Sequence, residues 1–175
     1  VKKDLVFLGP LATWLRQVLF TTQPQGTLRN NFSGWVGFKI TVGANDIFPA
    51  SIGRWVVAGN NQQHVMKIVD ASGNDIPGLS ATITTAGATP GTFAINPNLN
   101  TGNVTLKAHT TYYVVCHETA GGDQWYDYGA CPVTMLLNNA TFDGPAYADD
   151  TAPQTYLTTP SNHTYGPLTL YYKWG

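Results

Sequence analysis

Alternation of apolar and polar residues constrains the fold of this chain more than any other feature of its sequence. In GWVGFKITVG (34–43), the apolar residues Val36, Phe38, Ile40 and Val42 stand at every second position. Successive side chains of a strand point to opposite faces, so this spacing predicts a strand that is buried on one face. Similar alternation between clusters of turn-forming residues predicts strands at 52–58, 64–70 and 79–85.

Further short strands are predicted at 92–95, 104–108, 112–117, 124–128, 133–137 and 168–174. The strands at 52–58 and 64–70 are joined by the turn-type residues 59–63, which predicts a hairpin. No convincing amphipathic helix separates the strands, which excludes the helical crossovers of a parallel sheet. Roughly ten short strands in this arrangement predict an all-β fold, an antiparallel β-sandwich or jelly roll.

The length of 175 residues fits a single domain with an appended arm, because domains commonly contain about 100–200 residues. We assign residues 1–27 to an N-terminal arm that can insert as a strand, and residues 28–175 to the sandwich. Within the arm, residues 11–20 fit either a helix face or an edge strand. Residues 138–167 are polar and rich in proline, so they are predicted to form a long surface loop.

The composition excludes some classes of partner. Charged residues make up only 11% of the chain, against about 25% in a typical soluble protein. The formal net charge is −1 and there is no basic stripe, which argues against nucleic acid as a partner. No run of apolar residues is long enough to predict a membrane-spanning helix. Abundant threonine, glycine and aromatic residues instead favour an extracellular or cell-surface β protein.

The two cysteines, Cys116 and Cys131, flank a loop of 14 residues, 117–130. A disulfide closing such a loop would stabilise the fold by about 3 kcal/mol. The alternative is that each cysteine is a small buried apolar residue. We predict the disulfide, which would agree with an oxidising compartment.

The sequence contains none of the motifs that would indicate an enzyme. No serine lies in a Gly-x-Ser-x-Gly motif, no phosphate-binding glycine loop is present, and the histidines lack zinc-ligand spacing. Glu118 with Asp123 or Asp127 would offer the two carboxylates that a glycosidase needs. These acids lie in one short glycine-rich loop, where aspartate commonly caps turns. We therefore predict a protein that is not an enzyme and has no cofactor.

Three aspartates in the C-terminal part of the chain, Asp143, Asp149 and Asp150, are candidates for metal ligands. Carboxylate oxygens are the ligands that calcium prefers, and loops recruit this ion for stability. Solvated acidic side chains are the alternative interpretation. The sequence thus leaves a structural calcium ion open at these residues.

The richest cluster of potential ligand-binding side chains is ETAGGDQWYDY, at 118–128. Sugars have flat C–H faces that stack on aromatic rings, and their hydroxyl groups pair with carboxylates and amides. We predict that the ligand-binding residues of this segment are Asp123, Gln124, Trp125, Tyr126 and Tyr128. In a strand here, either Trp125 or Tyr126 must face the core.

Two other tryptophans lie on predicted strands. Trp35 shares a face with Lys39 and Thr41, so it is expected to be exposed and is a further ligand-binding candidate. Trp55 is expected to lie in the core, with Arg54 on the outward face.

Four segments together resemble a recurring module of secreted bacterial multidomain surface proteins. They are LRNNFSGWVGFKITVG (28–43), GRWVVAGNNQQHVMKIVDASG (53–73), TAGATPGTFA (85–94) and TTYYVVCHETAGGDQWYD (110–127). Such modules are similar to jelly-roll, carbohydrate-binding-type domains. The resemblance covers residues 28–137 and implies a β-sandwich in an extracellular setting, glycan or surface binding, and no catalytic residues.

These features give one functional hypothesis and one alternative. The hypothesis is a non-catalytic extracellular module that binds a polysaccharide or a surface glycan. The alternative is a structural subunit of an extracellular filament, sheath or coat, in which the N-terminal arm inserts as a strand into an identical subunit. The low charge, the apolar ends and the long loop near the C-terminus favour this alternative.

Overall fold

The computed structural model describes residues 17–18, 20–22, 26–128, 134–135, 139–150, 155–158 and 164–174. All regular structure in these ranges is β-strand, and they contain no helix. It follows that they hold no apolar helix that could cross a membrane. The predicted all-β class is confirmed.

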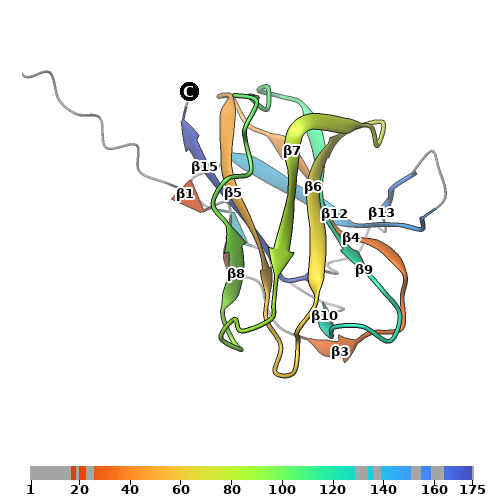
Figure 1. Cartoon of the computed structure of the whole chain (residues 1–175). Helices are drawn as coiled ribbons and strands as arrows, with labels where there is room; N and C mark the ends of the chain where they lie inside the picture. Colours follow the sequence, from red (N-terminus) through yellow and green to blue (C-terminus); the bar gives the residue numbers. More distant parts are fainter. Residues whose placement is uncertain are drawn as a thin grey trace, which may run out of the picture.

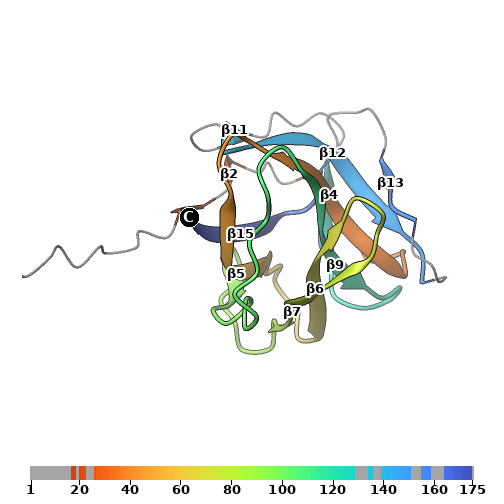
Figure 2. The same cartoon turned by 90° about the horizontal axis from the view of Figure 1, so that it is seen from above.

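Two antiparallel sheets face each other in a sandwich-like arrangement (Figures 1 and 2). The larger sheet has the strand order β13 (Leu157–Thr158), β12 (Ala140–Ala148), β4 (Gly34–Val42), β9 (Thr111–Glu118), β6 (Gln63–Asp70) and β7 (Asp75–Thr84). The smaller has the order β1 (Gln17–Val18), β15 (Leu168–Trp174), β5 (Ile47–Trp55) and β8 (Phe93–Asn96). Seen from above, β5 and β15 lie on one side and β4, β6, β9 and β12 on the other (Figure 2).

Two small sheets complete the described structure. One consists of β14 (Thr164–Gly166), β10 (Trp125–Tyr128) and β3 (Thr27–Arg29), and the other of β11 (Thr134–Met135) and β2 (Phe20–Thr22). In Figure 1, β3 and β10 lie at the lower end of the molecule, where the loop between β5 and β6 also turns. This end carries the candidate functional site.

The main hydrophobic core lies between the two large sheets. Phe38, Ile40 and Val42 of β4 point into it, as the alternation predicts, and none is more than 2% exposed. From the opposite sheet, β15 contributes Leu170 and Tyr172. Removal of apolar surface from water is the main favourable term in folding, so this layer holds the sheets together.

The outer face of the larger sheet carries a second hydrophobic cluster, which includes Trp35, Tyr113 and Tyr156. The rings of Tyr113 and Tyr156 are stacked, with their centroids 5.0 Å apart. The Lys67 ammonium group lies 4.0 Å from the centroid of the Trp35 ring and 2.7 Å from Asp75 Oδ1. Trp35 is therefore only 8% exposed. The expected exposure of Trp35 is wrong, because other side chains cover the face on which it lies.

The predicted hairpin between 52–58 and 64–70 is also wrong. Strand β5 pairs with β15 and β8, whereas β6 pairs with β7 and β9, so the connection crosses from one large sheet to the other. The Val56 N–H donates to Thr92 O on one side of the crossing, and the Thr85 N–H donates to Gln62 O on the other. Turn-forming residues predict a change of direction, but long-range pairing determines which strands become neighbours.

The segment 138–167 is not one long loop. It contains β12, which lies between β13 and β4 in the larger sheet, together with the short strands β13 and β14. The register of β12 against β4 shifts between Phe142 and Gly144, next to Pro145. Gly and Pro at a bulge are compatible with a strand, although in a sequence they are typical of a turn.

The N-terminal arm contributes strands to its own chain. Gln17 pairs with Tyr172, and Phe20 pairs with Met135, so the part of 11–20 that is described forms edge strand rather than helix. Residues 1–16 of the predicted arm lie outside the described residues. The strand predicted at 104–108 is reduced to one bridge between Ile47 and Leu106.

Candidate functional site

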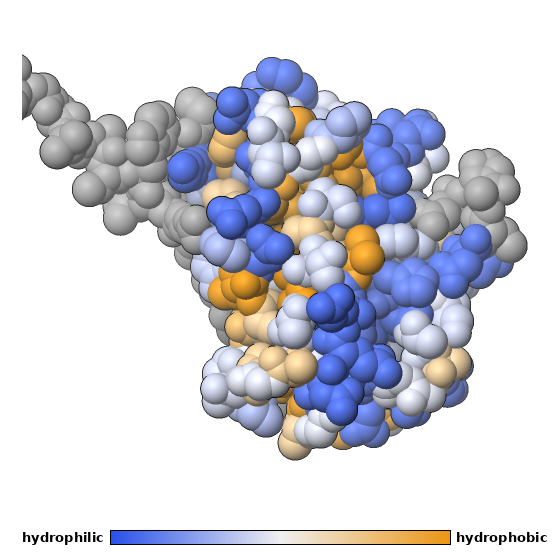
Figure 3. Space-filling view, viewed as in Figure 1, coloured by the Kyte–Doolittle hydropathy of each residue, from blue (hydrophilic) through white to orange (hydrophobic). Residues whose placement is uncertain are grey.

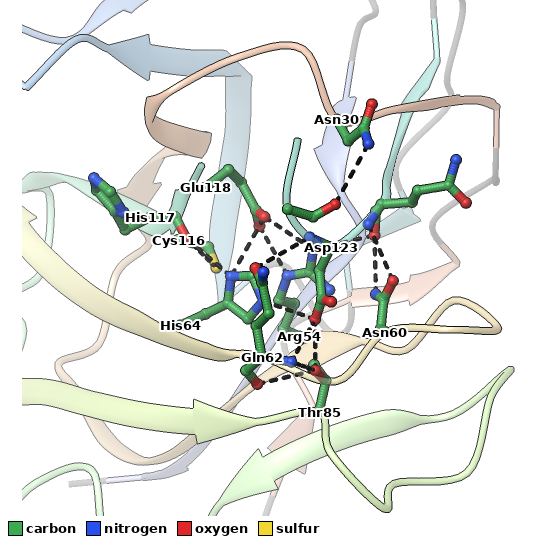
Figure 4. Close-up of polar contacts among 12 residues, drawn as sticks. Asn30, Arg54, Asn60, Gln62, His64, Thr85, Cys116, His117, Glu118 and Asp123 are labelled. Atoms are coloured by element: carbon green, nitrogen blue, oxygen red, sulfur yellow. Dashed lines mark hydrogen bonds and ion pairs between the residues drawn. The ribbon is translucent and has the colours of Figure 1, made fainter. Parts of the chain in front are cut away.

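A buried ion pair joins the two large sheets next to the candidate site (Figure 4). Arg54 Nε donates to Glu118 Oε1 at 2.8 Å and Nη2 to Oε2 at 2.9 Å, and both residues are 1% exposed. Burial lowers the pKa of Arg54, but the bonds to Glu118 outweigh it and hold the pKa above its ordinary value. The chain's single glutamate is therefore fully engaged inside the fold.

Asp123 joins the loop between β9 and β10 to the loop between β5 and β6. Its Oδ1 accepts the Asn61 N–H at 2.8 Å, and its Oδ2 accepts the Gln62 N–H at 3.1 Å and the Thr85 hydroxyl at 2.6 Å. Burial raises the pKa of Asp123, but these bonds and the contact with His64 outweigh it, so the pKa lies below its ordinary value. These partners belong to other segments of the chain, so Asp123 ties separate loops together rather than capping its own turn.

His64 lies between the two carboxylates (Figure 4). Its Nδ1 is 3.0 Å from the His117 carbonyl oxygen and 3.4 Å from Glu118 Oε2, and its Nε2 is 3.1 Å from Asp123 Oδ2. Both ring nitrogens face oxygen atoms, which hold the ring in place between β9 and Asp123. Arg54, His64, Glu118 and Asp123 are each only 1–6% exposed, so the network is shielded from water.

Cys116 is a free, fully buried cysteine. Alternation along β9 directs its side chain into the core, and burial together with Glu118 raises the pKa of the thiol. The other half of the predicted disulfide, Cys131, lies outside the described residues. The structure thus gives Cys116 the alternative role of a small core residue and shows no disulfide in its described part.

The Sγ of Cys116, a ring nitrogen of His64 and a carboxylate oxygen of Glu118 lie within 4.8 Å of one another. These are ligand types that zinc accepts. Here, however, the Arg54 guanidinium already occupies both oxygens of Glu118. The arrangement is therefore a hydrogen-bonded ion-pair network.

An aromatic hollow of about 140 Å³ lies beside this network. We define it by its lining residues, which are Arg29, Phe32, Val36, Trp125, Tyr147 and Tyr165. Four of these side chains are aromatic, and β10 and β14 hold two of them next to each other in one small sheet. The hollow is smaller than the roughly 300–1,000 Å³ of drug-sized sites, so its size suits one ring of a larger ligand.

The four rings of the aromatic hollow are packed edge to face in a continuous series. Trp125 meets Tyr165 at 5.8 Å, Tyr165 meets Tyr147 at 6.3 Å, and Tyr147 meets Phe32 at 6.4 Å, with interplanar angles of 83–89°. Edge-to-face packing of this kind stabilises aromatic clusters. The walls of the hollow are therefore formed largely by aromatic rings.

Arg29 gives the aromatic hollow a charged edge. Its guanidinium lies 5.5 Å from the centroid of the Trp125 ring and forms an ion pair with Asp127. Its Nε donates to Asn31 Oδ1 at 3.1 Å. Asp127 thus neutralises Arg29 next to the hollow.

The predicted ligand-binding residues are divided among several places. Trp125 is 3% exposed and lines the aromatic hollow, which agrees with the prediction that Trp125 or Tyr126 faces inward. Tyr126 is half-buried on the opposite face of β10. Asp123 and Gln124 line a second, polar hollow. The side chain of Tyr128 is outside what the structure describes.

The predicted orientation of Arg54 and Trp55 is reversed. Arg54 is 1% exposed and points inward, whereas Trp55 is half-buried and packs edge to face on Phe93, with centroids 5.0 Å apart. The buried neighbours Ile52 and Val56 share the face of Arg54. Their spacing was the signal that a charged side chain here would point into the protein.

The three aspartates proposed as calcium ligands do not converge. Asp143 accepts the Thr41 hydroxyl at 2.6 Å within β12, whereas Asp149 follows the far end of that strand. Asp150 Oδ1 lies 2.8 Å from His117 Nε2. No cluster of potential metal ligands among the described residues includes any of the three.

Sequence analysis missed four residues of the aromatic hollow: Arg29, Phe32, Tyr147 and Tyr165. Tyr147 and Tyr165 belong to the segment expected to be a loop, so no face was assigned to them. The available signal was the alternation in PAYA around Tyr147, which places one aromatic ring between two small residues.

Comparison of the chain with protein-family models, with curated proteins and with solved structures gives no match. The resemblance to secreted jelly-roll modules therefore stays a prediction.

Proposed function

We propose that this sandwich-like domain, of jelly-roll type, is a non-catalytic extracellular module that binds a polysaccharide or surface glycan through the aromatic hollow. The observation that carries the proposal is the edge-to-face series Trp125, Tyr165, Tyr147 and Phe32 beside the Arg29–Asp127 ion pair. Flat ring faces suit the C–H faces of a sugar, and the ion pair and tyrosine hydroxyls suit its hydroxyl groups.

The use of the acidic residues supports a binding role over glycoside hydrolysis. Hydrolysis needs two carboxylates on either side of an accessible bond. Glu118 is 1% exposed in its pair with Arg54, and Asp123 is 6% exposed and bonded to three loop groups. Both carboxylates are therefore engaged in structural contacts, Glu118 between the two large sheets and Asp123 between two loops.

The alternative function, assembly by strand insertion, requires the N-terminal arm to pair with another subunit. Strand β1 already pairs with β15 of its own chain, through Gln17–Tyr172 and Val18–Tyr171. Light scattering of the full chain and of a chain lacking residues 1–25 separates the two functions. If the protein assembles by strand insertion, the full chain should form a large particle, and the chain lacking residues 1–25 should not.

Retention by polysaccharides tests the proposal. We would measure mobility of the full chain in native gels containing xylan, mannan, soluble starch, hydroxyethylcellulose or polygalacturonate. The Tyr165→Ala and Tyr147→Ala variants are expected to bind the retaining polysaccharide about tenfold more weakly, because a lost stacking contact costs about 1 kcal/mol plus the buried area. Tyr171→Ala is the matched control, since Tyr171 lies on β15 and lines neither hollow. Equal retention of all four proteins would contradict the proposal.

A further inference from the structure

A second hollow, lined by polar groups, lies next to the aromatic one. We call it the polar hollow and define it by residues 58–62, from the loop between β5 and β6, and residues 121–124, from the loop between β9 and β10. Its volume is about 280 Å³, twice that of the aromatic hollow. Hydrophilic residues cover much of the lower part of the face in Figure 3, where these loops turn, and hydrophobic residues form only small patches there.

Hydrogen bonds fix the backbone of the polar hollow. Asn60 Nδ2 donates to Gln124 O at 2.9 Å, and the Gln124 N–H donates to Asn60 Oδ1 at 3.0 Å. Asp123 holds the opposite loop through the N–H groups of Asn61 and Gln62. A wall fixed in this way loses little conformational entropy when a ligand binds.

Three amide groups in the fixed wall have unused hydrogen-bonding capacity. Among the described residues, no partner is found for the side chains of Asn61 and Gln124 or for Nε2 of Gln62, whose Oε1 accepts the Asp123 N–H at 3.2 Å. Asn61 and Gln62 are exposed and Gln124 is half-buried. Each amide offers donors and acceptors without a net charge, which suits hydroxyl groups.

The two hollows adjoin each other where the polar loops meet the ends of β3 and β10. Trp125 and Arg29, which line the aromatic hollow, are register partners in β10 and β3. Asn30 directly follows β3, and it accepts the Gly121 N–H with its backbone oxygen at 2.7 Å and donates from its side chain to Gly122 O at 3.4 Å in the polar hollow. Gln124 precedes Trp125 directly. Consecutive residues, Gln124 and Trp125, thus line the polar and the aromatic hollow.

We infer that the polar hollow binds the hydroxyl groups of sugar units next to the unit held in the aromatic hollow, so that the ligand is a neutral oligosaccharide of at least two units. This inference rests on the proposed function. The ligand is inferred to be neutral because the charged side chains that line the hollows are already paired. Asp127 neutralises Arg29, and Asp123 is bonded to the loop between β5 and β6. An acidic sugar chain finds no unpaired cation among the residues that line either hollow.

Length dependence of binding tests the inference. We would titrate the full chain by calorimetry with xylo-, cello-, manno- and malto-oligosaccharides of one to six units, and with oligogalacturonates. In the wild-type chain, affinity for one neutral series is expected to rise about tenfold or more from one unit to three. In the double variant Asn61→Ala and Gln124→Ala, most of that rise is expected to disappear, since each lost hydrogen bond costs about 1 kcal/mol, or about fivefold.

The outcomes separate the inference from the proposed function. If a neutral series binds and its length dependence is unchanged in the double variant, the polar hollow is not a sugar subsite and only the inference fails. The inference also fails if the oligogalacturonates bind more tightly than every neutral series. If no oligosaccharide binds the wild-type chain, the proposed function fails and the inference fails with it.

Discussion

Arg54 and Glu118 form an ion pair with two hydrogen bonds, of 2.8 and 2.9 Å, between strands that belong to opposite sheets. Both side chains are almost completely shielded from water. Removal of charge from water is costly, so a buried pair contributes little net stability but is strongly destabilising when one member is lost. The pair also contacts the loop between β9 and β10, which forms one side of the polar hollow, through the bond from Arg54 to Gln124 O.

Replacing one member of this pair should therefore lower the stability of the folded protein. Arg54→Met is expected to lower the free energy of unfolding by about 3–5 kcal/mol, because Glu118 is left buried and unpaired. The double variant Arg54→Met and Glu118→Leu should recover much of the loss. Urea denaturation monitored by tryptophan fluorescence measures both, and a loss below about 1 kcal/mol in the single variant would contradict the structural role.

Acid should weaken the fold through Asp123. The pKa of Asp123 is lower in the folded state than in the unfolded state, where it is about 3.9. The ionised carboxylate therefore stabilises the folded protein fully above about pH 3.9, and this stabilisation is lost as the pH falls through the folded pKa. Asp123→Asn should be less stable than the wild type at pH 7, and the difference should shrink below about pH 4. Urea denaturation across this pH range measures the difference. A constant difference between the two proteins would mean that the carboxylate does not contribute in this way.

The Cys116 thiol should be unreactive in the folded protein. It is fully buried, and burial raises its pKa, so neither access nor the thiolate form is available. In a Cys131→Ser background, DTNB should leave Cys116 unmodified under native conditions and react with it after unfolding in urea. Reaction under native conditions at the rate of a free thiol would show that β9 does not hold this side chain in the core.

Gly37 should be needed for the close approach of β4 and β9. A Cβ at this position would overlap the Val114 carbonyl oxygen and lie 2.9 Å from Val115 Cα. Gly37→Ala is expected to cost about 3 kcal/mol, since backbone must move to admit the methyl group. The matched control is Gly102→Ala, whose Cβ would meet its nearest neighbour at 3.5 Å. Similar thermal unfolding temperatures for the two variants would contradict the expectation.

The features that the sequence determined depend on residues close together in the chain, whereas those that the tertiary structure decided depend on contacts between distant segments. Alternation is a local property, so the sequence alone determined the all-β class and the inward faces of Phe38, Ile40 and Val42. The same alternation also indicates an inward face for Arg54, because Ile52 and Val56, two positions away on either side, are buried. The charge of Arg54 instead led to the prediction of an outward face.

Strand partners, by contrast, depend on long-range pairing that no local pattern contains. The sequence could not show that β5 and β6 belong to different sheets, or that a bulge lets Gly144 and Pro145 lie within a strand. It also could not bring together Phe32, Trp125, Tyr147 and Tyr165, which come from separate segments of the chain. Only the tertiary structure decided where these rings meet, because their separation in space is set by sheet order and register rather than by separation in sequence.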